Sequence, residues 1–315
     1  MTPGASRFPI TLLVPLRRVS GRRDARLAGH LGAMGAIVDQ VLVVDGSTAT
    51  LVEEHRRHFG PPVDLVPAPP RRSGENGKVV GVLEGLRRAR HDIVVIADED
   101  VRHTAASLSM LAAALDDAAA VLPDNYFLRP LPWHAYWDTA RTLINRATGG
   151  DWPGTMAVRR SFILDVGGYR SDVLFENLEL VRTVVAAGGR VERLPGCFVG
   201  RQAPSLTVFL RQRVRQAYDE LARPGRLAAS LAVLPLTVVG ARRPRALGVA
   251  AAAIVLAAEY GRRLHGGRTV YPATASLLAP VWILERGICS WIAVGLRLRG
   301  GVNYAGTRIR YAATL

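Results

Sequence analysis

Short apolar runs alternate with segments of helical spacing along residues 8–221. The runs at residues 8–16, 39–45 and 93–97 are β-branched and bounded by turn residues, which is typical of strands buried on both faces. Further strands are predicted at residues 63–66, 119–122 and 191–199. Helices are predicted at residues 24–35, 50–59, 78–90, 104–117, 162–169, 173–187 and 205–221. This alternation indicates an α/β fold with βαβ units and a mainly parallel sheet.

The last third of the chain has a different pattern. Two apolar runs, at residues 227–240 and 246–258, are separated by Arg242-Arg243-Pro244-Arg245. Each run is shorter than the roughly 20 residues that a membrane-spanning helix needs. Residues 273–296 mix two Trp with charged residues and are predicted to form an interfacial amphipathic helix. We therefore expect a catalytic domain at residues 1–221 and a hydrophobic, Arg-rich helical region at 222–315. The alternative is that these helices form the core of a soluble helical domain.

Charge is distributed unevenly along the chain, which carries a net +15. Residues 222–315 contain 13 Arg and two acids, whereas residues 1–221 contain 28 basic and 24 acidic side chains. An anionic membrane surface attracts a segment that is both basic and apolar. Long Ala, Val and Leu runs are untypical of nucleic-acid binders, so we expect a membrane partner and no nucleic acid.

Cysteine usage and the N-terminus indicate the compartment. Cys197 and Cys289 lie far apart and form neither a disulfide framework nor a metal-binding spacing. Residues 1–9 lack the basic-then-apolar pattern of a signal peptide. We expect the chain to be made in the cytoplasm and to associate with the cytoplasmic side of the cell membrane.

Three acids, Asp98-Glu99-Asp100, follow the strand predicted at residues 93–97. Like charges at a strand end repel one another unless a cation lies among them, and a divalent cation bound by carboxylates and substrate phosphates supplies one. Lys78 is the one Lys among 41 basic residues, which favours a site that needs a compact ammonium group. The alternatives are a solvated acidic turn and a lysine retained by chance.

The order of these motifs over residues 9–218 resembles glycosyltransferase family 2, the inverting enzymes of GT-A fold that use nucleotide-diphospho-sugars. The tail resembles those of its polyprenyl- and lipid-glycosylating members. The matching motifs are a Pro turn after the first strand (Pro15), an Asp-Gly-Ser turn after the second (Asp45-Gly46-Ser47), a Gly-Lys helix start (Gly77-Lys78) and the Asp-x-Asp motif (Asp98-Glu99-Asp100).

The resemblance implies a role for each of these residues. Pro15, Asp45 and Ser47 would line the nucleotide site, and Asp45 could accept from the imino N–H of a uracil-type base, which favours a UDP-sugar. Lys78 lies at a helix start, which suits a pyrophosphate. By analogy, Asp100 binds Mg²⁺ or Mn²⁺, while Asp98 holds the ribose or the metal's waters.

The candidate catalytic base lies further along the chain. Family members carry a Gly-Gly-aromatic turn, here Gly167-Gly168-Tyr169, and then a Glu-Asp pair at a helix start. Here that pair reads Glu176-Asn177, and Asn cannot act as a base. The role therefore falls on Glu176 or Glu179, and we favour Glu176 because Glu179 also suits a first-turn helix acid.

The last family motif, Gln-x-x-Arg-Trp, is represented by Gln212, Arg213 and Arg215, with Gln216 in place of Trp. The two Arg side chains could clamp the diphosphate. Without the indole platform of processive members, we expect a single transfer.

The resulting hypothesis is a metal-dependent, inverting glycosyltransferase that uses a lipid-linked or hydrophobic acceptor. One alternative is a sugar-nucleotide pyrophosphorylase-like enzyme, but the Gly-rich fingerprint of that class is missing after the first strand. Another alternative is a non-catalytic membrane adaptor.

Overall fold

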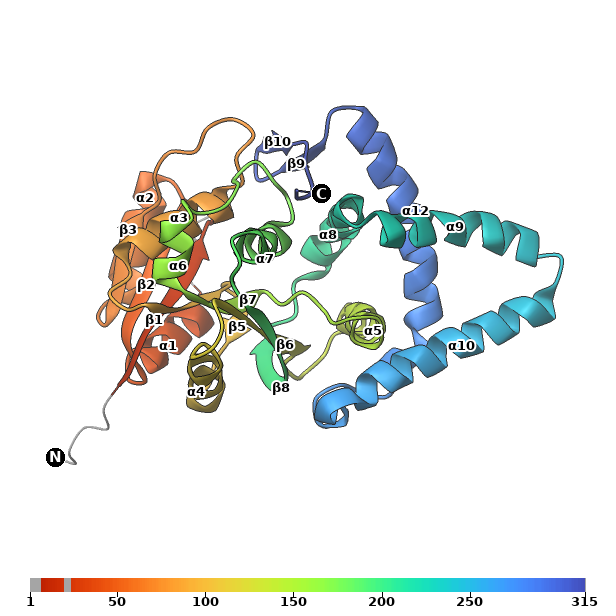
Figure 1. Cartoon of the computed structure of the whole chain (residues 1–315), viewed down its shortest axis with the longest axis horizontal. Helices are drawn as coiled ribbons and strands as arrows, with labels where there is room; N and C mark the ends of the chain where they lie inside the picture. The colour runs from red at the N-terminus through yellow and green to blue at the C-terminus, as the bar shows by residue number, and fades with distance from the viewer. Residues whose placement is uncertain (1–6, 20–23, 315) are drawn as a thin grey trace. The chain divides into compact units, whose positions relative to one another are not determined.

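The computed structural model describes residues 7–19 and 24–314, which form two compact units (Figure 1). Of the described residues, the first unit comprises 7–19, 24–124, 153–171 and 176–200, and the second comprises 125–152, 172–175 and 201–314. Residues 1–6, part of the N-terminal segment without a signal pattern, and residues 20–23 lie outside the described residues. The two units divide the chain at other positions than residue 221, and the predicted domain boundary there stays a prediction.

The first unit is built on a mixed sheet whose strands run in the order β3-β2-β1-β4-β7-β6-β8-β5. Strands β1 to β4 pair in parallel, and β7 pairs antiparallel to both β4 and β6. The predicted strands are confirmed, with β7 and β5 in addition. Their bounds are β1 (Phe8–Leu16), β2 (Val38–Asp45), β3 (Val63–Pro67), β4 (Ile93–Ala97), β5 (Val101–Arg102), β6 (Ala120–Phe127), β7 (Thr155–Arg159) and β8 (Val191–Arg201).

Helices cover both faces of this sheet. Because side chains alternate along a strand, Leu12 of β1 joins the core formed with α1 and α4, while Leu13 joins the core formed with α3, α6 and α7. The helix bounds are α1 (Ala25–Met34), α2 (Ala49–Phe59), α3 (Gly77–Arg88), α4 (Ala105–Ala114), α6 (Arg160–Asp165) and α7 (Glu176–Ala186). The register pairs Leu16 with Asp45, so the carboxyl ends of β1 and β2 lie side by side, as ligand sites of α/β sheets require.

The second unit is mainly helical. Helix α12 packs against α5, α8 and α9, and α9 joins α10 through a turn at residues 241–243 (Figure 1). The bounds are α5 (Trp133–Ala147), α8 (Leu206–Tyr218), η1 (Asp219–Ala222), α9 (Pro224–Gly240), α10 (Pro244–Arg263), η2 (Leu264–Thr269), α11 (Thr274–Leu277), α12 (Ala279–Leu298) and the hairpin β9 (Val302–Tyr304) and β10 (Thr307–Ile309).

The apolar runs of the tail form α9 and α10, and the segment predicted as one interfacial helix divides into α11 and α12. Among the described residues, α12 alone is long and apolar enough to cross a membrane by length and composition, and 39% of its apolar window is buried. Core helices of soluble proteins meet the same criterion, so this observation does not by itself assign a membrane location.

Candidate active site

The acid cluster lies immediately after β4, at the carboxyl end of a central strand. The backbone N–H of Asp98 donates to the carbonyl of Gly154 at 2.8 Å, and that of Val101 donates to the carbonyl of Asp98 at 2.9 Å. These bonds close a turn that carries Asp98, Glu99 and Asp100. All three side chains are partly exposed, so the sequence prediction of a charged strand end is confirmed.

Lys78 reaches this cluster from the start of α3. The side chain of Asn76 caps the helix by accepting from the backbone N–H of Lys78 at 3.0 Å, and Asn76 is itself buried. The Lys78 ammonium lies 2.6 Å from Asp98 Oδ1 and 2.7 Å from Glu176 Oε1. Burial disfavours its charge, but the two carboxylates outweigh that effect and hold the pKa of Lys78 above its usual value.

Helix α7 supplies the two candidate bases, which have different surroundings. Glu176, the first residue of the helix, is 16% exposed and contacts Lys78. Glu179 is one turn further on and is 3% exposed. Glu176 therefore lies beside the acid cluster through the shared Lys78, whereas the side chain of Glu179 is buried.

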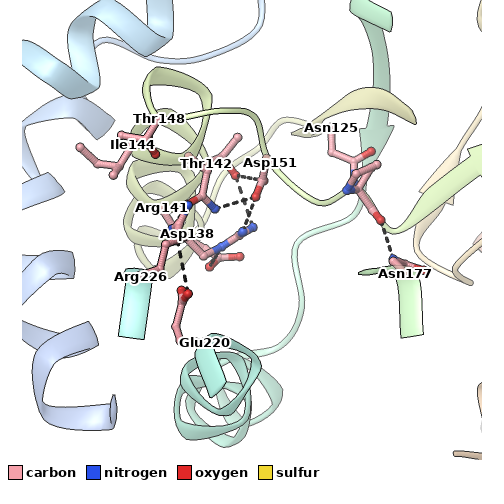
Figure 2. A network of polar contacts seen from close by, with 12 residues as sticks. Asn125, Asp138, Arg141, Thr142, Ile144, Thr148, Asp151, Asn177, Glu220 and Arg226 are labelled. Atoms are coloured by element: carbon pink, nitrogen blue, oxygen red, sulfur yellow. Dashed lines mark hydrogen bonds and ion pairs between the residues drawn. The ribbon is translucent and has the colours of Figure 1, made fainter. Parts of the chain in front are cut away.

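Asn177, the departure from the family pattern, has a structural role. Its amide N–H donates to the carbonyl of Pro153 at 2.7 Å (Figure 2). An ionised Asp has no donor for this bond. Asn177 thereby links the start of α7 to the segment just before β7.

Glu99 is held by an arginine that the sequence analysis did not single out. Arg18, which follows β1, lies 3.0 Å from Glu99 and 2.9 Å from Asp24. Burial and the neighbouring acids Asp98 and Asp100 raise the pKa of Glu99 to about 6, against the lowering effect of Arg18. Lysine and arginine together thus offset the repulsion among the three acids.

The donor set at this strand end fits a divalent cation that is completed by a substrate. Within residues 7–19 and 24–314, no group of three or more His, Cys, Asp and Glu side chains is arranged to hold a metal ion. Mg²⁺ typically takes one or two carboxylates and fills its remaining positions with substrate phosphates and water. The hard carboxylate oxygens of Asp98 and Asp100 match that pattern.

The residues predicted for the nucleotide lie at the neighbouring strand ends. Asp45 is buried, and its carboxylate contacts the His55 ring at 2.6 Å and accepts from the backbone N–H of Ser47 at 2.9 Å. The Ser47 hydroxyl accepts from the backbone N–H of Arg18 at 2.8 Å, which joins the turns after β1 and β2. Pro15 is half-buried on β1. The structure thus gives Asp45 and Ser47 defined roles in holding these turns.

The three predicted diphosphate ligands of α8 belong to the second unit. Arg213 is buried, and its guanidinium donates to Asp138 Oδ1 at 3.1 Å and lies over the ring of Phe209. Arg215 lies over the ring of Tyr304, and Gln212 is half-buried. The clamping role of these residues stays a prediction.

Asp138 belongs to a buried polar network on α5, seen in Figure 2. Arg141 bridges Asp138 and Asp151 at 3.1 and 2.7 Å. Asp151 also accepts from Asn145 at 2.7 Å, and Asn145 in turn accepts from Arg226 at 2.6 Å. The network connects α5 to the start of α9.

The sequence analysis did not single out His103 and gave Tyr169 no role of its own, although both side chains are buried. Tyr169, in the Gly-Gly-aromatic turn, has a pKa raised first by burial and then by the charge of Glu176. His103 Nε2 donates to the Thr155 hydroxyl at 2.9 Å, and that hydroxyl donates to the carbonyl of Ile96 at the end of β4. A polar residue soon after a buried strand was the available signal for His103.

Residues 36–165 match the family model described as Glycosyl transferase family 2. A comparison with curated protein sequences gives no significant match. This segment includes the second-strand turn, Lys78 and the acid cluster, which lie in the first unit.

Three solved structures are among those to which the chain is similar. The mannosyltransferase PcManGT from Pyrobaculum calidifontis, in complex with GDP-Man and Mn²⁺, is 21% identical over 91% of this chain and 88% of that chain, with a TM-score of 0.50. Mannosyl-3-phosphoglycerate synthase from Rubrobacter xylanophilus is 15% identical over 70% and 75% of the chains, with a TM-score of 0.42. Glucosyl-3-phosphoglycerate synthase from Mycobacterium tuberculosis is 17% identical over 66% and 76%, with a TM-score of 0.41.

The sheet confirms the predicted α/β architecture, and the family match confirms the predicted family for residues 36–165. The chain thus carries a glycosyl transferase family 2 domain on a GT-A fold.

Proposed function

We propose that this chain is a glycosyltransferase that moves a sugar from a nucleotide-diphospho-sugar to a hydroxyl of a lipid-linked or hydrophobic acceptor, in a single transfer with inversion. The observation that carries the proposal is Lys78, whose ammonium lies within 2.7 Å of both Asp98 and Glu176. One cation thus joins the acid cluster after β4 to the candidate base at the start of α7.

The chemistry assigned to these residues is one displacement. The acceptor hydroxyl oxygen attacks the anomeric carbon while the bond from that carbon to the diphosphate oxygen breaks, and the leaving nucleoside diphosphate takes the electron pair. Glu176 accepts the hydroxyl proton as the new bond forms. Attack from the face opposite the leaving group inverts the configuration at that carbon.

Lys78 supplies positive charge where the diphosphate would lie. It sits at the amino end of α3, where backbone N–H groups and the helix dipole also favour an anion. Asp98 and Asp100 would hold Mg²⁺ or Mn²⁺, and a divalent ion there would act as a Lewis acid for the leaving group. The Pyrobaculum mannosyltransferase has been solved with GDP-Man and Mn²⁺, which supports this donor class, and UDP remains our favoured nucleotide.

The surface of the second unit supports a hydrophobic acceptor and attachment to the cytoplasmic side of a membrane. Helix α9 has no buried residue, and Leu236, Val238 and Val239 near its end are all exposed. The Arg-rich turn that follows is exposed as well. Exposed apolar side chains beside basic ones are typical of a segment that binds an anionic lipid surface.

A donor screen tests the proposal. Full-length protein in detergent is incubated with Mn²⁺ or Mg²⁺ and each nucleotide-sugar, with and without lipid extract, and released nucleoside diphosphate is measured. We expect release with one donor class, increased by the lipid extract. Release of pyrophosphate from a sugar phosphate and a nucleoside triphosphate would instead favour a pyrophosphorylase-like enzyme, and no turnover with any donor would favour an adaptor.

A further inference from the structure

One face of α12 carries three buried hydrogen-bond donors that lack an acceptor. Trp282, Arg286 and Ser290 are spaced four residues apart, which places them on the same side of the helix. They are 2%, 4% and 0% exposed. Within the described part of the chain, no partner lies within hydrogen-bond distance of Trp282 Nε1, Arg286 Nε and Nη1, or Ser290 Oγ.

Arg286 is the exceptional member of this face, because it is a buried guanidinium with no ion pair among the described residues. Its guanidinium carbon lies 5.3 Å from the ring centroid of Trp282, a contact that supplies no acceptor for Nε and Nη1. Burial lowers the pKa of Arg286, and the charges of the more distant Glu220 and Glu285 oppose this effect without reversing it. Buried charges in proteins are normally paired.

The nearby acids are already bound to other cations. Glu220 pairs with Arg223 at 3.0 Å and Arg226 at 3.4 Å. Glu285 accepts from Trp137 at 2.7 Å and lies 3.8 Å from Arg213. Neither acid lies within ion-pair distance of Arg286.

Among the residues that the structure describes, the ion pairs of the surrounding network do not include Arg286. They join four acids to four arginines, which are Asp138, Asp151, Glu220, Glu285, Arg141, Arg213, Arg223 and Arg226. The neighbours of Arg286 on this face of α12, Trp282 and Ser290, contribute only further polar groups that are unpaired within the described chain.

We propose that this face of α12 binds a phosphate group, with the Arg286 guanidinium as the principal ligand and the Ser290 hydroxyl and Trp282 indole N–H as further donors. A phosphate offers several acceptor oxygens and the negative charge that Arg286 lacks, and an arginine fork matches its geometry. The site requires no glycosyl transfer, so it stands independently of the proposed function.

The phosphate could belong to a soluble compound or to a lipid. The opposite side of α12 carries exposed Ile288, Trp291 and Ile292, which could contact the chain of a phosphorylated lipid. Inorganic phosphate and dihexanoyl phosphatidic acid below its micellar concentration therefore form the two arms of the test.

The test measures affinity calorimetrically, together with the Tm of the full chain, at an ionic strength matched with sodium chloride. We expect both ligands to bind and to raise the Tm, since a ligand that binds only the folded state stabilises it. In Arg286→Met the affinity should fall by about tenfold or more. The Tm without phosphate should be unchanged or higher, because an uncompensated buried charge is removed. Arg268→Met, at an exposed arginine of the same unit, is the matched control and should bind as the wild type does.

Two smaller changes keep the proposal testable if Arg286→Met fails to fold. Ser290→Ala and Trp282→Phe each remove one donor and should each weaken phosphate binding. The proposal would be overturned if the wild-type chain did not bind phosphate or if Arg286→Met bound it with full affinity. It would also be overturned if both Ser290→Ala and Trp282→Phe kept full affinity. If phosphatidic acid binds more tightly than inorganic phosphate and Ile288→Ser removes this difference, the ligand is a lipid phosphate. If the two ligands bind with equal affinity, the ligand is a soluble phosphate.

Discussion

Lys78 Nζ lies 2.7 Å from Glu176 Oε1, although the two residues are 98 positions apart in the chain. The same ammonium lies 2.6 Å from Asp98. Removal of Lys78 would therefore affect two carboxylates at once. It would also remove the compact cation at the start of α3 that we assign to the donor diphosphate.

Lys78→Met should weaken donor binding by about tenfold or more, since a hydrogen bond to a charged group contributes about 1.5–3 kcal/mol. Titration calorimetry with the donor found in the screen measures this. Arg88→Met, at the exposed end of the same helix, is the control and should bind the donor normally. Equal donor affinity in both variants would remove Lys78 from the diphosphate site.

Glu176→Gln should reduce transfer by about 10²-fold or more, because the amide cannot take the acceptor proton. Donor binding should be retained, since the amide keeps a hydrogen-bonding side chain beside Lys78. Single-turnover kinetics separate these two effects. Glu179→Gln serves as the matched variant on the same helix, and if it is the inactive one the base is Glu179.

Asp100→Ala should abolish the divalent-dependent part of both donor binding and turnover. Our assignment makes Asp100 a metal ligand, and a Mg²⁺ site of this kind relies on only one or two protein carboxylates. Calorimetry of the donor with and without Mn²⁺ measures the loss. Asp117→Ala, at an exposed acid of the same unit, should leave it intact. Metal-dependent affinity that survives in Asp100→Ala speaks against a metal site at this strand end.

The central strands could be predicted from sequence because their signal is local. The runs that became β1, β2 and β4 are continuous and β-branched, so a buried strand is the conformation that each favours by itself. The acid cluster was predictable for the same reason, as it follows directly after such a run. The contact between Lys78 and Glu176 could not be predicted from the sequence, because it depends on how α3 and α7 pack on the sheet.

Helix α5 shows why other parts could not be predicted. Its buried face includes Asp138 and Asn145, and the half-buried Arg141 pairs with Asp138, while Asn145 donates to Asp151. A helix that buries polar residues lacks the apolar period by which helices are recognised. Arg213 donates to Asp138, which lies 75 positions earlier in the chain. The position of Arg213 could therefore not be predicted from its own segment.

The contribution of His103 to the stability of the first unit should fall as the pH falls below about 6.5. His103 is buried, and burial lowers its pKa to about 3, with a smaller effect from His30. Between pH 6.5 and 3, His103 therefore binds a proton in the unfolded chain but stays neutral in the folded chain. This contribution to stability is complete above that window and is lost as the pH decreases, by up to about 1.4 kcal/mol per pH unit.

Urea unfolding of the full chain at several pH values, with a probe in the first unit, measures this slope. His103→Gln keeps a neutral donor near Thr155 and cannot titrate, so its slope should be shallower. A His103→Gln chain with the wild-type slope would show that His103 is not the group responsible.

The membrane prediction is best tested at the turn between α9 and α10. A chain ending near residue 221 would be a poor test, since it would remove α12 and expose the faces of α5 and α8 that α12 covers. The turn carries three exposed arginines, Arg242, Arg243 and Arg245, which can be replaced without disturbing a hydrophobic core. An anionic surface attracts each such Arg with about 1 kcal/mol. Replacing all three by Gln should therefore weaken binding to vesicles that contain phosphatidylserine by about 10²-fold.

The exposed apolar residues of α9 should contribute a part of the binding that salt does not remove. Leu236→Ser with Val239→Ser changes two of them and should release the protein in a high-salt wash that the wild type resists, because salt screens charges but not apolar burial. Vesicle sedimentation of the full chain at low and high salt measures both contributions. Arg87→Gln with Arg88→Gln, at the exposed end of α3 in the first unit, lowers the net charge without touching this surface and should leave sedimentation unchanged. Full-length protein that stays in the supernatant with anionic vesicles at low salt would remove the membrane from the proposed function and favour a soluble acceptor.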